Sequence, residues 1–199
     1  GGKQIPEGTQ AYHRLAGGGG DDTFKVYGNA GLDQYDGGEG HDTIAGTRYN
    51  DTIQVSDNLD NIQNIEAIDG GEGYDTLQGG AGNDTIDLSN GPTLTSIEEI
   101  DGGYGDDTII GSDGNDIIEG NRGNDTLSGG GGDDTFKVYG NAGLDHFDGG
   151  EGHDTIAGRR YNDTISVTDN LDNIRNIEHI DGGEGSDTLQ RRHAPDTTA

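Results

Sequence analysis

Apolar side chains recur every nine residues along much of this chain, with glycine and aspartate at fixed places between them. The unbroken run 102–137 reads GGYGDDTII, GSDGNDIIE, GNRGNDTLS and GGGGDDTFK. Each nonapeptide follows G-G-x-G-x-D-x-U-x, where U is apolar. Its glycine-rich first six residues suit a sharp turn. Its last three, with one apolar side chain facing inward, suit a very short strand. The pattern therefore predicts an alternation of turns and short strands.

Fourteen nonapeptides fit this pattern, and two of their positions never vary. Position one is always glycine, and the units start at residues 17, 28, 37, 46, 70, 79, 102, 111, 120, 129, 140, 149, 158 and 182. Position six is always aspartate: Asp22, Asp33, Asp42, Asp51, Asp75, Asp84, Asp107, Asp116, Asp125, Asp134, Asp145, Asp154, Asp163 and Asp187. Position four is glycine except at Tyr49 and Tyr161, where we expect degenerate turns. Disorder does not require such regularity, so we predict an ordered chain.

A longer repeat contains the short one. Residues 17–78 align with 129–190 without a gap at an offset of 112, and eight of the 62 positions differ. We expect a repeat region at 17–190, built from these two long copies joined by further repeats. A degenerate N-terminal repeat or cap is expected at 1–16 and a degenerate tail at 191–199.

Successive units that wind as half-turns of a coil would stack every second strand in parallel, with the apolar side chains as an interior ladder. The turns of units n and n+2 would then be neighbours. Within the unbroken runs we predict seven such pairs, given by their first residues: 17 and 37, 28 and 46, 102 and 120, 111 and 129, 120 and 140, 129 and 149, 140 and 158. Backbone carbonyls and position-six carboxylates would line each gap, which suits Ca²⁺ better than Mg²⁺.

Two kinds of interruption test this arrangement. The pairs Val26-Tyr27 and Val138-Tyr139 are two-residue insertions, which preserve strand parity and would leave Val26 and Val138 facing inward. The segments 55–69, 88–101 and 167–181 lack the turn motif. We interpret them as metal-free half-coils with a bulged loop before them, because Ile68, Ile100 and Ile180 fall at position eight. The alternative is a short amphipathic helix.

Composition limits the function classes. Only 27% of residues are hydrophobic and 40 are glycine, so an ordinary large core is excluded. Thirty-nine acidic and 11 basic side chains give a net charge of -28, which argues against nucleic acid and anionic membranes as partners. The chain has no cysteine for disulfides or thiolate metal sites. No catalytic motif is present, so we expect no catalytic site in this chain.

The nonapeptide resembles the RTX, or haemolysin-type, calcium-binding repeat over most of residues 17–190. The resemblance implies an all-β, right-handed parallel β-roll with Ca²⁺ in the Gly-Asp turns. The expected metal ligands are the fourteen position-six aspartates and the backbone of turn glycines Gly18, Gly20, Gly38, Gly40, Gly103, Gly105, Gly114, Gly123, Gly130, Gly132, Gly143, Gly150 and Gly152. About seven or more Ca²⁺ ions are expected, and seven would bring the charge from -28 to -14.

The resemblance also implies a role. We expect a module that folds and is stabilised when it binds Ca²⁺, in a protein secreted by a type I pathway and located outside the cell or on its surface. Further domains of a longer parent chain are expected partners. Two alternatives stay open: a structural or adhesive cell-surface module, and the repeat region of a secreted enzyme or toxin whose active domain lies outside this chain.

Overall fold

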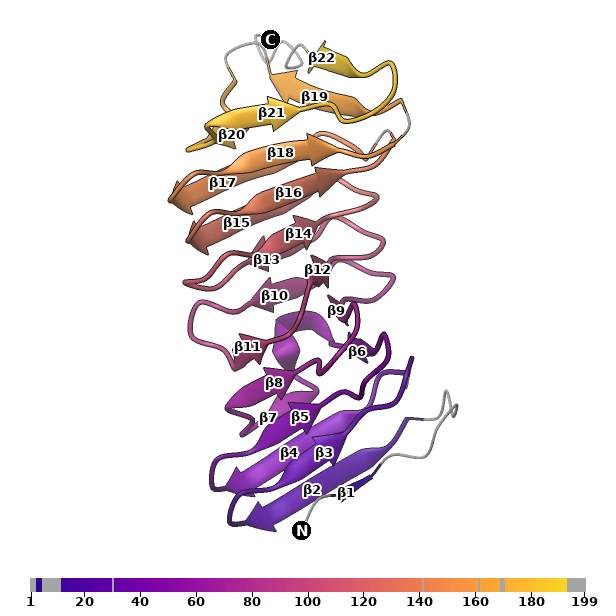
Figure 1. The fold of residues 1–199 in the computed structure, drawn as a ribbon, viewed down its shortest axis with the longest axis vertical. Helices are drawn as coiled ribbons and strands as arrows, with labels where there is room; N and C mark the ends of the chain where they lie inside the picture. Colours follow the sequence, from indigo (N-terminus) through magenta and orange to yellow (C-terminus); the bar gives the residue numbers. More distant parts are fainter. Residues whose placement is uncertain are drawn as a thin grey trace, which may run out of the picture.

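The computed structural model describes residues 3–4, 12–29, 31–140, 142–160, 162–168 and 171–192. Within these ranges the chain is a parallel β-solenoid, and Figure 1 shows its strands stacked along one long axis, with β1 and β2 near one end and β22 near the other. The predicted all-β β-roll is thus confirmed. No helix in the described ranges is both long and apolar enough to cross a membrane.

The strands form five sheets, and every pairing between them is parallel. The first holds β1 (Lys3–Gln4), β3 (Thr23–Lys25), β5 (Thr43–Ala45), β8 (Ala67–Asp69) and β11 (Thr93–Thr95). The second holds β2 (Arg14–Gly19), β4 (Gln34–Glu39) and β7 (Ile62–Gln63). These two sheets face each other in the N-terminal coils, because β2 leads through a motif turn into β3 and β4 leads into β5.

A third, longer sheet runs from the first copy into the second. Its members are β6 (Thr52–Gln54), β9 (Thr76–Gln78), β12 (Glu99–Asp101), β14 (Ile117–Glu119), β16 (Thr135–Val138), β18 (Thr155–Gly158) and β21 (His179–Asp181). The fourth sheet lies opposite, with β10 (Thr85–Asp87), β13 (Thr108–Ile110), β15 (Thr126–Gly131), β17 (His146–Glu151) and β20 (Ile174–Arg175). The last pair is β19 (Thr164–Thr168) and β22 (Thr188–Arg192).

The predicted interior ladder is confirmed. Position eight is buried in every motif unit except the last, where Leu189 is 57% exposed. Burial of each such side chain contributes about 1.5–3 kcal/mol, so a ladder one side chain wide is a modest core. Phe24 packs edge-on against Tyr35 with ring centroids 5.7 Å apart, and Phe136 repeats this against Phe147 at 5.6 Å.

Both two-residue insertions keep their valines inside, as predicted. Val26 and Val138 are each buried in the core beside the phenylalanine two residues earlier. The Val26 N–H donates to the Ala45 carbonyl at 2.8 Å, so the chain continues its pairing with the next coil beyond the end of β3. Parity therefore holds through the insertion.

The interrupting segments are half-coils rather than amphipathic helices. Residues 55–69 contain a short 3-10 helix, η1 (Asp57–Leu59), followed by β7 and β8. Ile68 and Ile100 are buried at position eight as expected, whereas Ile180 is 40% exposed. One detail of the prediction is wrong: each segment supplies two strands in different sheets, namely β7 and β8, β11 and β12, and β20 and β21. Residues 169–170 of the third segment lie outside the described residues.

The expected cap and tail fall mostly outside the described ranges. From the N-terminal repeat, β2 is described, and Leu15 pairs with Tyr35 in the register of the motif strands. Tyr161, expected in a degenerate turn, also lies outside the described residues.

Candidate metal sites in the stacked turns

Strand register decides which turns are neighbours. Five of the seven predicted pairs are confirmed, namely units 17 and 37, 102 and 120, 111 and 129, 120 and 140, and 129 and 149. Three more pairs join units separated by an interruption: 46 and 70, 79 and 102, and 158 and 182. A motif turn therefore lies on a motif turn at eight places.

The predicted pairs 28 with 46 and 140 with 158 are wrong. Strand β4 of unit 28 pairs with β2 and β7, and β17 of unit 140 pairs with β15 and β20. The insertion is the physical cause, because Gly28 occupies the place next to Asp51 that a position-six aspartate holds elsewhere. The Gly28 N–H donates to Asp51 Oδ1, and its carbonyl accepts from the Thr52 N–H at 3.0 Å. Gly140 does the same with Asp163 and Thr164.

Each of the eight gaps is crossed by the same hydrogen bond from one position-six residue to the next. The backbone N–H of the earlier aspartate donates to Oδ1 of the later one. The pairs are Asp22–Asp42, Asp51–Asp75, Asp84–Asp107, Asp107–Asp125, Asp116–Asp134, Asp125–Asp145, Asp134–Asp154 and Asp163–Asp187, at 2.7–3.0 Å. One carboxylate oxygen is thus committed to the backbone.

The other carboxylate oxygen points into the turn and has no hydrogen-bond partner among the described residues at seven buried positions: Asp33, Asp42, Asp75, Asp107, Asp125, Asp134 and Asp154. Buried polar atoms are almost always paired, and a buried charge without a counter-charge is costly. Burial accordingly raises the pKa of Asp125 and of Asp134 to about 7 each. These oxygens have the environment of atoms that bind a cation.

Of the other expected carboxylates, Asp22, Asp51, Asp145 and Asp163 are buried, Asp84 and Asp116 are half-buried, and Asp187 at the C-terminal end is exposed.

Glycines at positions two and four bring carbonyl oxygens to the same gaps. Twelve of the thirteen expected glycines have a positive φ, and only Gly114 does not. A Cβ on Gly38 would collide with the Gly18 carbonyl oxygen, and one on Gly123 would collide with that of Gly105. Carbonyls of one turn therefore face the next turn at van der Waals range, which only glycine allows.

Position five carries a second ladder that the sequence pattern did not reveal. In each of the eight gaps the earlier unit has Asp or Asn there, whose side-chain oxygen accepts from the position-five N–H of the later unit. The acceptors are Asp21, Asn50, Asn83, Asp106, Asn115, Asn124, Asp133 and Asn162, at 2.8–3.1 Å. The acceptors are all Asp or Asn, and this restriction becomes visible in the sequence only when the stacking order is known.

Glutamates replace the aspartate in the half-coils, which the sequence reading also missed. Counting back from Ile68, Ile100 and Ile180, position six is Glu66, Glu98 and Glu178. Their Oε2 atoms accept from the N–H groups of Asp42, Asp75 and Asp154, each at 2.7 Å. The longer side chain continues the ladder, so the coils stay in register where the glycine turn is missing.

Two buried asparagines, Asn61 and Asn173, anchor the loops before the half-coils. The Asn61 Nδ2 donates to the carbonyls of Asp33 at 2.8 Å and Gln54 at 3.0 Å. Asn173 makes the equivalent bonds to Asp145 and Ser166.

The N-terminal turn has His13 at position six. Its N–H donates to Asp33 Oδ1 at 2.8 Å, and its Nδ1 lies 3.0 Å from the same oxygen. His41 and His153, at position five of their units, are exposed.

The donor set is made of oxygen. Within the described ranges no group of three or more His, Asp or Glu side chains converges on one point. A metal in these gaps would therefore take most ligands from backbone carbonyls, with one or two carboxylates. Such a set fits Ca²⁺, which accepts 6 to 8 oxygens in flexible geometry.

Comparison with protein families matches the chain to the family described as RTX calcium-binding nonapeptide repeat (4 copies). It covers residues 14–44, 36–62, 64–92, 101–136, 137–165 and 177–190. No curated protein and no solved structure matches the chain. The matched segments span well over half of the chain and contain the stacked turns, and the chain therefore belongs to the RTX calcium-binding nonapeptide repeat family.

Proposed function

We propose that each of the eight gaps between stacked motif turns binds one Ca²⁺, and that this binding drives the folding of the chain. The carboxylate ligands are the buried Oδ2 atoms of Asp42, Asp75, Asp107, Asp125, Asp134 and Asp154, which have no hydrogen-bond partner among the described residues. The carbonyls of positions two and four supply the other ligands. The observation that carries the proposal is the row of buried carboxylate oxygens without hydrogen-bond partners, since a divalent cation is the group that compensates such atoms.

The negative charge of the chain makes folding depend on Ca²⁺ binding. Neighbouring position-six carboxylates lie one coil apart, about 4.8 Å, so the solenoid concentrates like charges that an expanded chain keeps separate. Eight ions carry sixteen positive charges and would bring the net charge from -28 to -12. The narrow apolar ladder alone does not offset the entropy of ordering a chain with 40 glycines. Calcium binding energy is then folding energy.

The Ca²⁺ concentration of the compartment then decides whether the chain folds. Extracellular calcium modules bind with dissociation constants of about 10⁻⁴ to 10⁻³ M, above cytosolic and near external Ca²⁺ levels. The chain stays expanded inside the cell and folds outside it, which suits export through a type I channel. Membership of the RTX repeat family, which is typical of secreted proteins, supports this export. The protein acts as a stabilising repeat module that joins other parts of a longer protein.

Stoichiometry tests the assignment of sites. Equilibrium dialysis with radioactive Ca²⁺, in excess Mg²⁺, should give about eight bound ions per chain, because the gaps are eight. Gly103→Ala, which puts a Cβ against the Gly80 carbonyl, should remove about one ion. Gly91→Ala, outside the motif turns, serves as control. Binding of fewer than three ions, or equal competition by Mg²⁺, would refute the proposed sites.

A further inference from the structure

A second concave feature lies on the outer side of the third sheet, beside the gap between the turns of units 102 and 120. It is a groove of about 600 Å³ where β9, β12 and the turns after β12, β14 and β16 meet. Six of its lining side chains carry the argument: Gln78, Asp101, Tyr104, Asn121, Arg122 and Tyr139. It combines exposed aromatic rings with a polar floor.

Two exposed tyrosines stand at this groove. Tyr104 is 60% exposed and Tyr139 is 49% exposed. A guanidinium lies over each ring: Arg122 is 5.9 Å from the Tyr104 centroid and Arg159 is 5.8 Å from the Tyr139 centroid. Tyr104 and Arg122 are also paired through their backbones in parallel register. Stacked turns and cation–π contacts therefore hold rigid amphipathic surfaces in place.

The polar floor centres on Asp101. Its Oδ2 accepts from Gln78 Nε2 at 3.0 Å, and its Oδ1 accepts from Asn121 Nδ2 at 2.5 Å. The three side chains are half-buried, so they present planar donors and acceptors in fixed orientations. Such groups match pairs of hydroxyls on neighbouring carbons.

An ion-pair cluster around two buried glutamates supports one side of the groove. Arg159 contacts Glu119 at 2.5 Å and Glu99 at 3.2 Å, and Lys137 contacts Glu99 at 3.1 Å. This cluster fixes the arginine that stacks on Tyr139. The first long copy has Thr47 where the second has Arg159. The groove is therefore built once, at the junction of the copies, and is not a by-product of the repeat.

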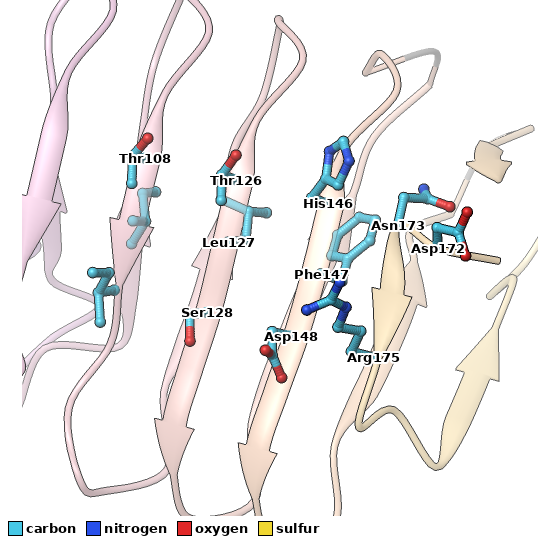
Figure 2. Close-up of a pocket in the computed structure, with 12 residues that line it drawn as sticks. Thr108, Thr126, Leu127, Ser128, His146, Phe147, Asp148, Asp172, Asn173 and Arg175 are labelled. Carbon is cyan, nitrogen blue, oxygen red and sulfur yellow. The ribbon is translucent and has the colours of Figure 1, made fainter. Parts of the chain in front are cut away.

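A comparable hollow shows what is particular about this groove. Figure 2 shows Thr108, Thr126 and His146 side by side over β13, β15 and β17, with Arg175 beside Asp148. That hollow has polar groups and the exposed residue His146, but its one phenyl ring, Phe147, is buried beneath the sheet surface. It offers no tyrosine ring to a ligand.

We propose that the groove at Tyr104 and Tyr139 binds a saccharide. A pyranose ring has an apolar face of C–H groups that stacks on a tyrosine, and a rim of hydroxyls that donate to Asp101 and accept from Asn121 and Arg122. A phosphate-bearing or nucleic-acid ligand is disfavoured by the Asp101 carboxylate and by the net charge of -28.

The experiment starts with the whole chain in millimolar Ca²⁺, its folding checked by far-UV CD. An array of neutral malto-, cello- and galacto-oligosaccharides and of hexuronate oligosaccharides is screened, and any hit is titrated calorimetrically. At least one class should bind. Tyr104→Ala should weaken binding about tenfold or more, because the variant loses the aromatic face on which the sugar ring stacks. Tyr104→Phe should retain most of the affinity.

Tyr12→Ala is the matched control, because Tyr12 is also exposed but lies outside the groove and outside the eight metal gaps. It should bind like the unaltered chain. A folded chain that binds no saccharide would overturn the inference, as would equal loss in Tyr12→Ala and Tyr104→Ala. The inference rests on the calcium-folded state of the proposed function, and a chain that stays disordered in Ca²⁺ would instead contradict that function.

Discussion

The backbone N–H of Asp116 donates to Oδ1 of Asp134 at 2.8 Å across the gap between their turns. One residue earlier, the direction is reversed, since Asn115 Oδ1 accepts from the Asp133 N–H at 2.9 Å. The two bonds fix the Asp134 side chain so that its second oxygen lies inside the turn, buried and without a hydrogen-bond partner. The same residue thus sets the register of two coils and is a metal ligand in the proposed function. That proposal couples calcium binding to coil stacking.

Removing one charge at position six should weaken calcium-driven folding. Asp134→Asn keeps an oxygen that can accept from the Asp116 N–H, but loses the carboxylate for the metal. We expect the Ca²⁺ midpoint of folding to rise about threefold or more, because Ca²⁺ affinity depends on ligand charge. The midpoint is read from far-UV CD during a Ca²⁺ titration.

Asp133→Asn is the matched control for that variant. It removes the same charge one residue away, at a position where asparagine serves as acceptor in other units, as Asn115 and Asn124 do. Its midpoint should stay within about 1.5-fold of the unaltered chain. Equal effects of the two substitutions would mean that net charge, not ligation by Asp134, controls folding.

Alanine substitution at two turn glycines should show which glycines are required by the close approach of neighbouring turns. Gly123 has φ +154, and a Cβ there would collide with the Gly105 carbonyl oxygen, whereas a Cβ on Gly114 meets only the Ser112 hydroxyl at 3.6 Å. Gly123→Ala should lower the free energy of unfolding in Ca²⁺ by about 1–3 kcal/mol. Gly114→Ala should be neutral or stabilise by up to about 1 kcal/mol. Urea unfolding measures the unfolding free energy of both variants. Equal changes in the two would contradict the close approach of neighbouring turns at Gly123.

The apolar ladder should be most sensitive at its centre. Ile109 is fully buried, so Ile109→Ala leaves a cavity and should cost about 2–5 kcal/mol in unfolding free energy. Leu189 is 57% exposed, so Leu189→Ala should cost less than about 1 kcal/mol. Thermal unfolding in saturating Ca²⁺ ranks the two. A larger cost at Leu189 would contradict the position of the core.

Local pattern was enough to predict the strands and the ladder, because turn and strand are each decided within nine residues. The stacking order of the turns, in contrast, is not decided within nine residues. The prediction assumed that every second unit stacks. Instead, Gly28 lies next to Asp51 where a position-six aspartate lies in other coils, and each half-coil segment adds a second strand. The stacking order therefore depends on the length of chain between successive sheets, which the nine-residue pattern does not contain.

The ladder at position five was missed for a related reason. Position five looks variable when all units are aligned, since His41, Tyr74 and Leu144 occur there. Those residues contribute only a backbone N–H to the gap, while the earlier unit contributes the side chain. The requirement for Asp or Asn applies only to the earlier unit, which cannot be recognised until the stacking order is known.

Stability in saturating Ca²⁺ should fall as pH rises through about 8. Burial and the neighbouring Glu99 raise the pKa of Glu119 from 4.5 to about 8, with Asp101 adding to the rise and Arg159 opposing it. Since the folded chain holds this proton more tightly than the unfolded chain, the stabilisation is present at low pH and is lost as pH rises through the folded pKa. Chemical unfolding at pH 7 to 9 measures the effect.

Glu119→Gln should flatten this pH dependence, because the amide cannot ionise and still donates to Glu99. Glu151→Gln, at an exposed position, should leave the slope unchanged. A chain whose stability is constant from pH 7 to 9, or a Glu119→Gln variant with an unaltered slope, would refute the raised pKa.

Calcium titration followed by far-UV CD tests the central claim most directly. The chain is first stripped with EDTA and then titrated with Ca²⁺, with Mg²⁺ in a parallel series. We predict a disordered spectrum in EDTA and a cooperative gain of β-structure at submillimolar to millimolar Ca²⁺, with no gain in Mg²⁺. A β-spectrum that persists unchanged in EDTA, or a chain that stays disordered at 10-fold higher Ca²⁺, would contradict calcium-driven folding.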